Sequence, residues 1–373
     1  NKFHKEVLFR RSRGFAPNYL NININSAEKI MAMGADLKSS IAFYPNNYLY
    51  VSQYLGNLEN YDVYNRFTSE VNSFINIFEK QPEVVLIDKH PLYQSSQYGK
   101  ELAKQQNSKL IEIQHHKAHF TAVIGEHNLF NEKVLGVVFD GTGYGDDAQI
   151  WGGEFFDYEA DKIARINHLE YFDWLLGDKM SKEPRLSLFS LASNEMNGIL
   201  EQKFTSYELK TYQYLKENNK LKTSSVGRLF DAVASLLNIT DCNTYEGEAA
   251  ILLENVVETY DFKSCKSYLN SSEVFSAKEI ILNIYKDISI GNSSKSIIPN
   301  FLFTLANFIV NYAEKHHYKH LAFSGGVFQN TTLIDMLIEL APKEIKLYFH
   351  KDLSPNDENI SFGQLMYYLH LKN

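Results

Sequence analysis

The sequence predicts an α/β protein with two lobes, and three observations lead to this prediction. Several short apolar runs of strand length alternate with stretches that have helical periodicity. Two of these runs, 134–140 and 320–324, pass directly into glycine-containing segments and lie far apart in the chain. The chain has 373 residues, which is long for one simple domain and sufficient for two packed lobes.

The strand predictions rest on near-continuous apolar runs, which are typical of strands buried on both faces of a sheet. Two runs end at an aspartate, Asp88 and Asp140, and a third continues into Ser324-Gly-Gly326. Several strands therefore end in a residue of chemical interest. The expected strands are 83–88, 134–140, 320–324 and 345–350.

Helices are expected where apolar residues recur every three to four positions. The stretch 288–300 is polar, with Ser, Asn and Gly, and is expected to be an exposed loop. No internal repeat of fixed period is evident. The expected helices cover about 27–35, 66–80, 95–106, 116–127, 225–238, 246–260, 301–316 and 360–371, and a further one begins near Thr331.

Composition excludes several classes of protein. The 37 basic and 45 acidic residues give a net charge of −8, which argues against a sequence-independent nucleic-acid binder. Cys242 and Cys265 are too few for a disulfide framework or a cysteine-based zinc finger, so a reducing, cytoplasmic location is expected. No apolar run of about 18 residues and no signal-peptide pattern is present. Because the chain begins with Asn, we expect it to be cut from a longer protein.

A histidine cluster, Gln114-His-His-Lys-Ala-His119, is the first candidate for chemistry. On a helix, His115 and His119 would lie on one face, about one turn apart, and could bind one metal ion. Partly buried polar histidines are the plainer alternative. Asp140 and Asp357 could complete the site, although a loop-closing role or an Asx turn would also explain them. Two imidazoles with one or two carboxylates suit Fe(II), Zn or Mn.

The glycine segments are the second candidate. Backbone N–H groups in such loops can hold phosphate oxygens. Gly141, Gly143 and Gly145 form one segment, and Gly325 and Gly326 lie in the other. Each segment alone is a weak signal, because most glycine pairs form ordinary turns. Together they fit a nucleotide between two lobes.

Two acidic residues form a third candidate. Asp231 and Glu246 could accept hydrogen bonds from ribose hydroxyls. A solvated helix face that carries Arg228 and Asp231 is the plainer alternative, and the residues alone favour it.

Eight segments, taken in order, match the motifs of one family. From about residue 7 to 370 the chain resembles the C-terminal region of the HypF family, the carbamoyltransferases of nickel-iron hydrogenase maturation. Any one motif would be weak evidence, whereas eight in order are highly specific. The matching segments are Met33–Lys38, Asp88–Tyr93, Gln114–His119, Phe139–Gly145 with Ile150–Glu154, Thr223–Asp231, Tyr245–Gly247, Phe323–Asn330 and Ser354–Asp357.

The resemblance implies the two-lobed architecture of actin and sugar kinases, with nucleotide and metal between the lobes. It implies a first lobe at 21–133 and a second at 134–373. Residues 1–20, with Arg10-Arg-Ser-Arg-Gly14 and Pro17, would be the remnant of a preceding YrdC-like domain. The implied metal ligands are His115, His119, Asp140 and Asp357, and the two histidines are also the implied catalytic residues. The implied nucleotide-binding residues are Gly143, Gly325, Gly326 and Asn330, with Asp231 and Glu246 near the ribose.

The implied reaction passes a carbamoyl group from carbamoyl-adenylate, derived from ATP, to the C-terminal cysteine thiol of the partner HypE. This step leads to the cyanide ligands of the hydrogenase. The implied cofactor is a divalent metal, iron or zinc, with magnesium as a further candidate. Neither nucleic acid nor membrane is an expected partner.

Some positions depart from the family pattern. Tyr54 and Asn57 stand where His and Asp are usual, Glu248 replaces Gln, and the segment before Arg185 lacks a common Trp. Two alternatives remain open. One is an O-carbamoyltransferase that acts on a small-molecule hydroxyl; the other is a nucleotide-binding docking module, inactive without its missing domains. A tRNA-modifying relative is disfavoured by the net charge and by the segment ending at Asn330.

Overall fold

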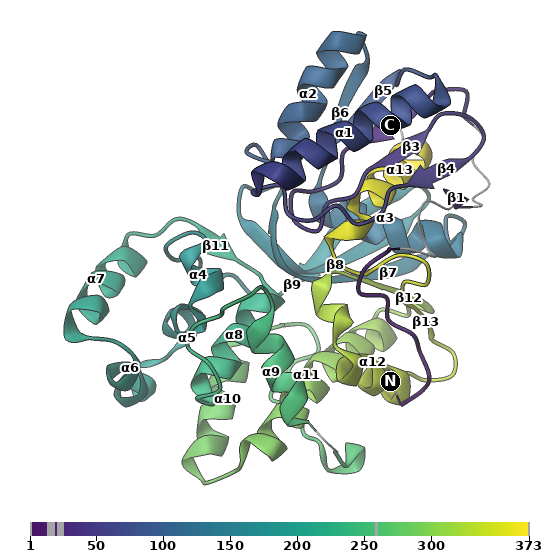
Figure 1. Cartoon of the computed structure of the whole chain (residues 1–373). Coiled ribbons are helices and arrows are strands. Elements are labelled where there is room, and N and C mark those ends of the chain that lie inside the picture. The colour runs from purple at the N-terminus through teal and green to yellow at the C-terminus, as the bar shows by residue number, and fades with distance from the viewer. Residues whose placement is uncertain (1, 13–18, 21–25, 258–259, 372–373) are drawn as a thin grey trace.

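Two β-sheets organise the computed structural model, which describes residues 2–12, 19–20, 26–257 and 260–371 (Figure 1). The first sheet has the strand order β1(Tyr19–Leu20), β4(Leu49–Val51), β3(Ala42–Tyr44), β2(Ile30–Ala32), β5(Val84–Asp88) and β6(Lys109–Ile113). The second has the order β10(Phe172–Asp173), β11(Lys222–Thr223), β8(Ile150–Glu159), β7(Val134–Tyr144), β12(His320–Ser324) and β13(Lys346–Tyr348), with β9(Lys162–His168) paired to β8. The two sheets form the centres of the two predicted lobes.

The two sheets share one topology. In the first, β2, β3 and β4 form an antiparallel meander, and β5 and β6 then add in parallel on the other side of β2. In the second, β7, β8 and β9 form the meander, and β12 and β13 add in parallel beside β7. The fold is therefore duplicated, although no sequence period indicates it.

Alternation along the strands of the first sheet sends side chains to two separate cores. Met31 and Val85 pack with α1(Tyr61–Phe78) and α2(Gln94–Gln106) on one face. Ile30 and Val84 pack with α13(Ile360–His370) on the other. Both faces are covered, which explains why β5 reads as a continuous apolar run.

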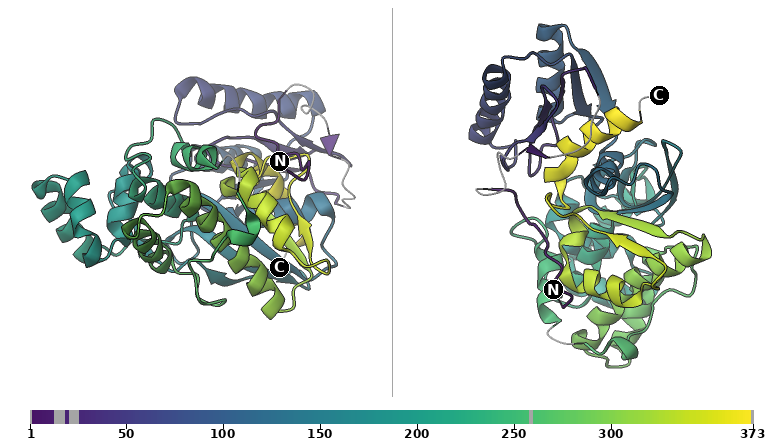
Figure 2. Two further views of the ribbon diagram at one scale, coloured as in Figure 1. Left: turned by 90° about the horizontal axis from the view of Figure 1, so that it is seen from below. Right: turned by 90° about the vertical axis from the view of Figure 1, so that its right-hand side faces the viewer.

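The helix α3(His115–His127) lies between the lobes (Figures 1 and 2). Ala118 and Ala122 belong to the core of the first sheet, whereas Phe120 and Val123 belong to a core with the second sheet. Because it contacts both sheets, α3 is buried on nearly all sides. Residues at its N-terminus are thereby fixed relative to both lobes.

The C-terminal helix α13 packs closely on α3. A Cβ atom on Gly363 would lie 1.9 Å from the carbonyl oxygen of Ala118, so only glycine allows this approach. The buried side chains of α13 share a core with the first sheet, so residues 360–370 group structurally with that sheet. The lobe limits 21–133 and 134–373 remain a prediction.

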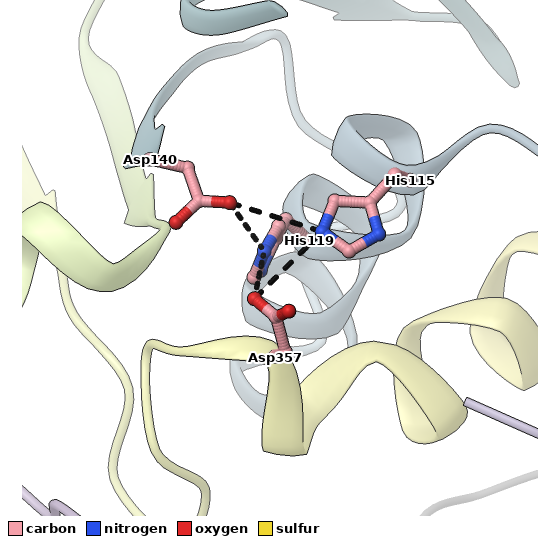
Figure 3. A group of neighbouring side chains, drawn as sticks. All are labelled: His115, His119, Asp140 and Asp357. Atoms are coloured by element: carbon pink, nitrogen blue, oxygen red, sulfur yellow. Dashed lines mark ion pairs between the residues drawn. The ribbon is translucent and has the colours of Figure 1, made fainter. Parts of the chain in front are cut away.

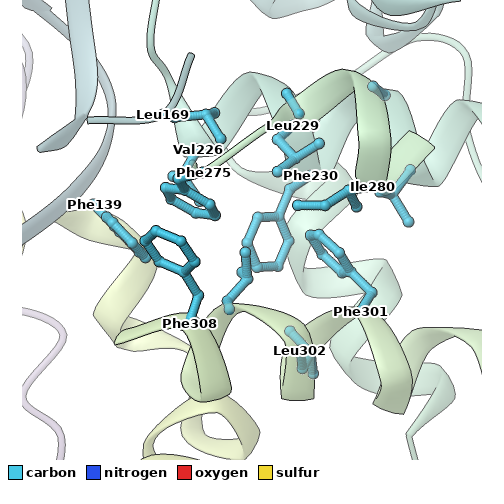
Figure 4. Packing of buried hydrophobic residues seen from close by; sticks show 14 of the residues in the cluster. Phe139, Leu169, Val226, Leu229, Phe230, Phe275, Ile280, Phe301, Leu302 and Phe308 are labelled. Atoms are coloured by element: carbon cyan, nitrogen blue, oxygen red, sulfur yellow. The ribbon is translucent and has the colours of Figure 1, made fainter. Parts of the chain in front are cut away.

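The second lobe holds the largest core, in which phenylalanine rings stack between the sheet and its helices (Figure 4). The Phe275 ring stacks on Phe139 of β7 at 5.7 Å and on Phe308 at 4.6 Å between centroids. These contacts support the middle of β7, where Asp140 follows Phe139. The further helices are α4(Lys179–Lys182), α5(Pro184–Leu191), α6(Asn197–Lys203), α7(Ser206–Glu217), α8(Val226–Leu236), α9(Glu248–Val256), α10(Ala277–Ser289), α11(Ser294–Lys315) and α12(Thr331–Leu340). Short 3-10 helices are η1(Asn194–Met196), η2(Phe262–Ser264), η3(Gly326–Gln329) and η4(Asp357–Asn359).

The helix α11 is long and apolar enough to cross a membrane by length and composition, but 72% of its most apolar window is buried in the structure. Phe301, Leu305 and Phe308 belong to the second-lobe core. In the structure α11 is therefore a helix of the second-lobe core.

The N-terminal segment 2–12 reaches the loop that precedes α13. The backbone N–H of Arg11 donates to both carboxylate oxygens of Glu358 at 2.8 and 3.0 Å, and Asn356 Nδ2 donates to the carbonyl of Phe9 at 3.1 Å. The remnant of a preceding domain at 1–20 remains a prediction; Arg13, Gly14 and Pro17, which it includes, lie outside the described residues.

All four expected strands are present as β5, β7, β12 and β13, but three other predictions about local structure were wrong. The apolar run at 27–35 forms the strand β2 rather than a helix, because it pairs with β3 and β5 along its two edges and helices bury it on both faces. The stretch 288–300 ends α10 and begins α11 at Ser294. The expected glycine loop after Asp140 is instead a continuation of β7, with a register shift between Phe139 and Gly143.

Candidate metal centre

His115 and His119 occupy the first two turns of α3. Gln114 caps the helix, because its side chain accepts a hydrogen bond from the N–H of Lys117 at 2.9 Å. The two imidazole rings lie 4.9 Å apart, as the four-residue spacing predicts for one helix face. Both side chains are fully buried.

Asp140 and Asp357 approach these histidines from two other parts of the chain (Figure 3). Asp140 lies in β7, within the register shift between Phe139 and Gly143, and Asp357 begins η4 after the Asn356 cap. His115 Nε2 lies 3.8 Å from Asp140 Oδ2 and 3.7 Å from Asp357 Oδ1. For His119 Nε2 the distances are 3.7 and 3.6 Å. The structure therefore brings the four predicted ligands together, with all ligand atoms within 4.8 Å of one another.

The site has the features of a set of ligands for one ion. The His–Asp separations are too long for hydrogen bonds, and neither Nε2 atom has a hydrogen-bond partner among the described residues. Ligand atoms at about 2.1 Å from a tetrahedral ion would lie about 3.4 Å apart, close to the separations of this site. Buried imidazole nitrogens without a partner are costly, and a metal ion would satisfy them. Two nitrogens and two oxygens fit Fe(II), Zn or Mn.

The electrostatics of the cluster also favour a cation. Burial opposes charge on His115, but Asp88, Asp140 and Asp357 outweigh burial and hold its pKa well above the ordinary value. Burial would raise the pKa of Asp140, but the two histidines hold it well below the usual range. Two carboxylates at such close range need compensating positive charge.

Neighbouring groups orient three of the four predicted ligands. Asp88 Oδ2 lies 2.8 Å from His115 Nδ1, Asn359 Oδ1 lies 3.1 Å from His119 Nδ1, and the N–H of Gly326 donates to Asp140 Oδ1 at 3.2 Å. With Nδ1 protonated, each histidine directs the lone pair of Nε2 to the centre. Sequence reasoning noted Asp88 as the end of a strand and the start of the matching segment Asp88–Tyr93 but gave it no role at the site, and it missed Asn359.

The predicted phosphate-binding glycines border this cluster. Gly143 is packed against His116, since a Cβ atom there would lie 2.3 Å from His116 Cε1. Gly325 has φ +97°, and its Cβ would lie 2.2 Å from the Phe139 carbonyl oxygen. Close packing accounts for both glycines in the structure, so their binding of phosphate remains a prediction.

Asn330 has one group available for a ligand. Its Oδ1 accepts from the N–H of Leu333 at 2.8 Å and caps α12. Its Nδ2 is buried and has no hydrogen-bond partner within the described part of the chain. A donor in this state is suited to a ligand oxygen.

Glu246, a predicted ribose acceptor, is paired with Lys38 at 2.6 Å. Burial would lower the pKa of Lys38, but Asp357 and Glu246 outweigh burial and raise it, so the side chain stays charged. The backbone N–H of Lys38 is held by Asn57 Oδ1 at 2.9 Å. Asn57, which departs from the family pattern, therefore holds the segment that carries Lys38. Sequence reasoning quoted Lys38 within a motif and assigned it no role.

The other departures also have structural partners. Arg10 lies over the Tyr54 ring at 5.4 Å, Glu248 accepts from the Thr244 hydroxyl at 2.9 Å, and Arg185 pairs with Glu183 at 2.9 Å. None of these contacts involves a predicted metal ligand.

Asp231 lies buried on α8. Arg228 Nε is 2.7 Å from its Oδ2, and Asn243 Nδ2 donates to its Oδ1 at 3.3 Å. Burial raises the pKa of Asp231 to about 6, against the opposing effect of Arg228. Its contacts with Arg228 and Asn243 leave the predicted ribose contact untested.

The Asp231→Asn variant is expected to have a flatter dependence of stability on pH. The raised pKa of Asp231, about 6, makes its stabilising contribution complete below about pH 4, and this contribution is lost as the pH rises through about 6. Between pH 4 and 8 the wild type should lose about 3 kcal/mol more stability than the variant. Denaturant unfolding at several pH values measures this difference, and parallel profiles would contradict the raised pKa.

A two-lobed α/β fold and a buried His₂Asp₂ cluster at the lobe junction define the chain as a candidate metal-dependent enzyme. The family model described as "HypF Kae1-like domain" matches residues 25–126. The model "Carbamoyltransferase, Kae1-like Domain, second subdomain" matches residues 136–364. The chain belongs to the HypF family of carbamoyltransferases.

Individual relatives agree with this assignment. The carbamoyltransferase HypF of Synechocystis sp. is 33% identical, over 97% of this chain and 50% of the relative. A crystal structure of full-length HypF in a phosphate- and nucleotide-bound form is 31% identical with a TM-score of 0.85, over 97% of this chain and 49% of that one. The T. kodakarensis HypF structure is 27% identical with a TM-score of 0.87, over 96% and 50%. The chain thus spans about half the length of these relatives.

Proposed function

We propose that this chain transfers a carbamoyl group from carbamoyl-adenylate to the C-terminal cysteine thiol of HypE. The observation that carries the proposal is the buried pair of histidines whose Nε2 atoms face two carboxylates and have no other partner among the described residues. Membership of the carbamoyltransferase family supports the type of reaction.

His115, His119, Asp140 and Asp357 would hold the metal ion, with iron or zinc as the expected metal. The ion would supply Lewis-acid stabilisation of the negative charge that develops on the donor. The acceptor sulfur attacks the carbamoyl carbon, the bond from that carbon to the phosphate oxygen breaks, and AMP leaves with its electron pair. The thiol proton is released to water.

The acceptor sulfur belongs to the partner. Cys242 is exposed, and Cys265 Sγ contacts the Asp261 carbonyl at 3.5 Å. Neither cysteine is among the groups that contact the four ligands. Two free thiols are consistent with a cytoplasmic location, which we include in the proposal.

We place the nucleotide beside the metal centre. Asn330 Nδ2 would donate to an oxygen of the donor, and Gly325 and Gly326 would line its phosphate. Ribose binding at Glu246 would require a hydroxyl to compete with Lys38. The nucleotide found in the related HypF structure supports a nucleotide site in the family, and magnesium could accompany the phosphate.

The test supplies metal-loaded protein with carbamoyl-adenylate and a peptide that copies the C-terminal tail of HypE. Mass spectrometry of the peptide should find one added carbamoyl group on the cysteine. A peptide with serine in place of cysteine is the matched control, and carbamoylation of that peptide would favour hydroxyl transfer. No transfer by metal-loaded protein would contradict the proposal for this chain and favour the docking module.

A further inference from the structure

A chain of buried side chains extends from the metal ligand His119 to Glu126. Ser324 Oγ lies 3.2 Å from His119 Nδ1 and 2.9 Å from His350 Nε2. The other nitrogen of that ring, His350 Nδ1, makes a short contact with a carboxylate oxygen of Glu126. His119 and Ser324 are fully buried, His350 is 5% exposed and the Glu126 side chain 3% exposed. This series of side chains connects α3, the end of β12 and the segment after β13.

The hydrogen bonds in this series of side chains, from His119 to Glu126, all run in one direction from donor to acceptor. Metal binding by Nε2 requires a proton on His119 Nδ1, which Ser324 Oγ and Asn359 Oδ1 accept. The Ser324 hydroxyl is then free to donate to His350 Nε2. That leaves the proton of His350 on Nδ1, where it is donated to Glu126. Every proton has an acceptor in this arrangement.

We propose that Ser324, His350 and Glu126 are positioning residues that fix the tautomer and ring orientation of His119 for metal binding. This inference rests on the proposed metal site. It assigns different supports to the two histidine ligands: His115 contacts the carboxylate of Asp88 directly, and His119 reaches the carboxylate of Glu126 through two intervening side chains.

Two other roles explain this series of hydrogen-bonded side chains less well. A Ser–His–Glu arrangement can activate a nucleophile, but Ser324 is fully buried and its oxygen is engaged by His119, His350 and Asn359. A purely structural role accounts for Glu126 Oε1, which accepts from the N–H groups of 351, 352 and 353. It does not account for Oε2, which is directed at His350.

The test measures the dissociation constant of Co²⁺ by competition with a chelator, together with the Co²⁺ absorption spectrum. Ser324→Ala and Glu126→Gln are each expected to weaken Co²⁺ binding about 10-fold, which is the lower end of the usual range for residues that hold a metal ligand in place. Each variant should also alter the Co²⁺ absorption spectrum. Both substitutions remove little volume. Thermal unfolding of the metal-free variants reports whether they fold.

The double variant Ser324→Ala/Glu126→Gln is the decisive member of the set. If Glu126 acts through Ser324, the double variant should bind Co²⁺ no more weakly than whichever single variant binds it less tightly. Both substitutions would then interrupt the same series of hydrogen bonds, so their effects would not add. Asp88→Asn is the positive reference, and His127→Gln, next to Glu126 on α3 and bonded to the Phe349 carbonyl at 2.7 Å, is the matched control.

Each outcome has one meaning. Wild-type affinity in folded single variants, or losses that multiply in the double variant, would overturn the positioning role and leave the metal site intact. A wild-type protein that binds no Co²⁺ would overturn both the metal site and the inference that depends on it.

Discussion

The His119→Ala variant is expected to contain no bound metal and to lose carbamoyl transfer by at least about 100-fold. The substitution removes one of four predicted ligands from a buried site, and it leaves the carboxylates of Asp140 and Asp357 with one neighbouring imidazole in place of two. Elemental analysis after metal loading measures the stoichiometry, about one ion per wild-type chain. The peptide assay measures transfer.

The control for this variant is His127→Gln, on the same helix and outside the cluster. It should retain both metal and transfer. Stoichiometric metal in folded His119→Ala would exclude His119 as a ligand, and transfer by a metal-free variant would separate the reaction from the site.

The Gly363→Ala variant is expected to destabilise the fold by about 3 kcal/mol or more. The added methyl would lie 1.9 Å from the backbone carbonyl oxygen of Ala118, which has no side-chain freedom to yield. Relief requires α13 and α3 to separate, and this movement would displace His115 and His119. Denaturant unfolding measures the loss, and weaker metal binding should accompany it.

Gly198→Ala is the matched control, because nothing lies within 4 Å of the Cβ position at Gly198 in α6. It should stabilise the protein slightly, by about 0.5–1 kcal/mol. Equal stability of Gly363→Ala and wild type would show that the contact between α3 and α13 adapts.

The cluster that forms the candidate metal site could be predicted because most of its signals are local. The spacing of His115 and His119 defines one helix face, and Asp140 ends an apolar run that reads clearly as a buried strand. Asp357 was named as a candidate carboxylate with an Asx turn as the plainer alternative, and the resemblance then implied its role as a ligand. The supporting residues Ser324 and Asn359 could not be found from periodicity, because their roles depend on contacts between distant segments.

Two of the wrong local predictions have physical causes that the sequence alone does not show. At β2 the apolar run is short and buried on both faces, and periodicity does not separate such a strand from a buried helix. At the start of α11 the polar residues lie on a helix whose later turns pack in the core, so tertiary packing outweighs composition. The duplicated topology leaves no sequence signal, because the same strand order is built from different residues.

A metal ion bound by the four predicted ligands would act as a form of cross-link in this chain. Its two cysteines are both free, so no disulfide joins distant parts of the chain. An ion held by His119 on α3 and Asp357 on η4 would close a loop that contains most of the second lobe. Because the unfolded chain has no preformed site, the free energy of ion binding would add to the stability of the folded chain. Metal removal should therefore lower the melting temperature of the whole protein as well as its activity.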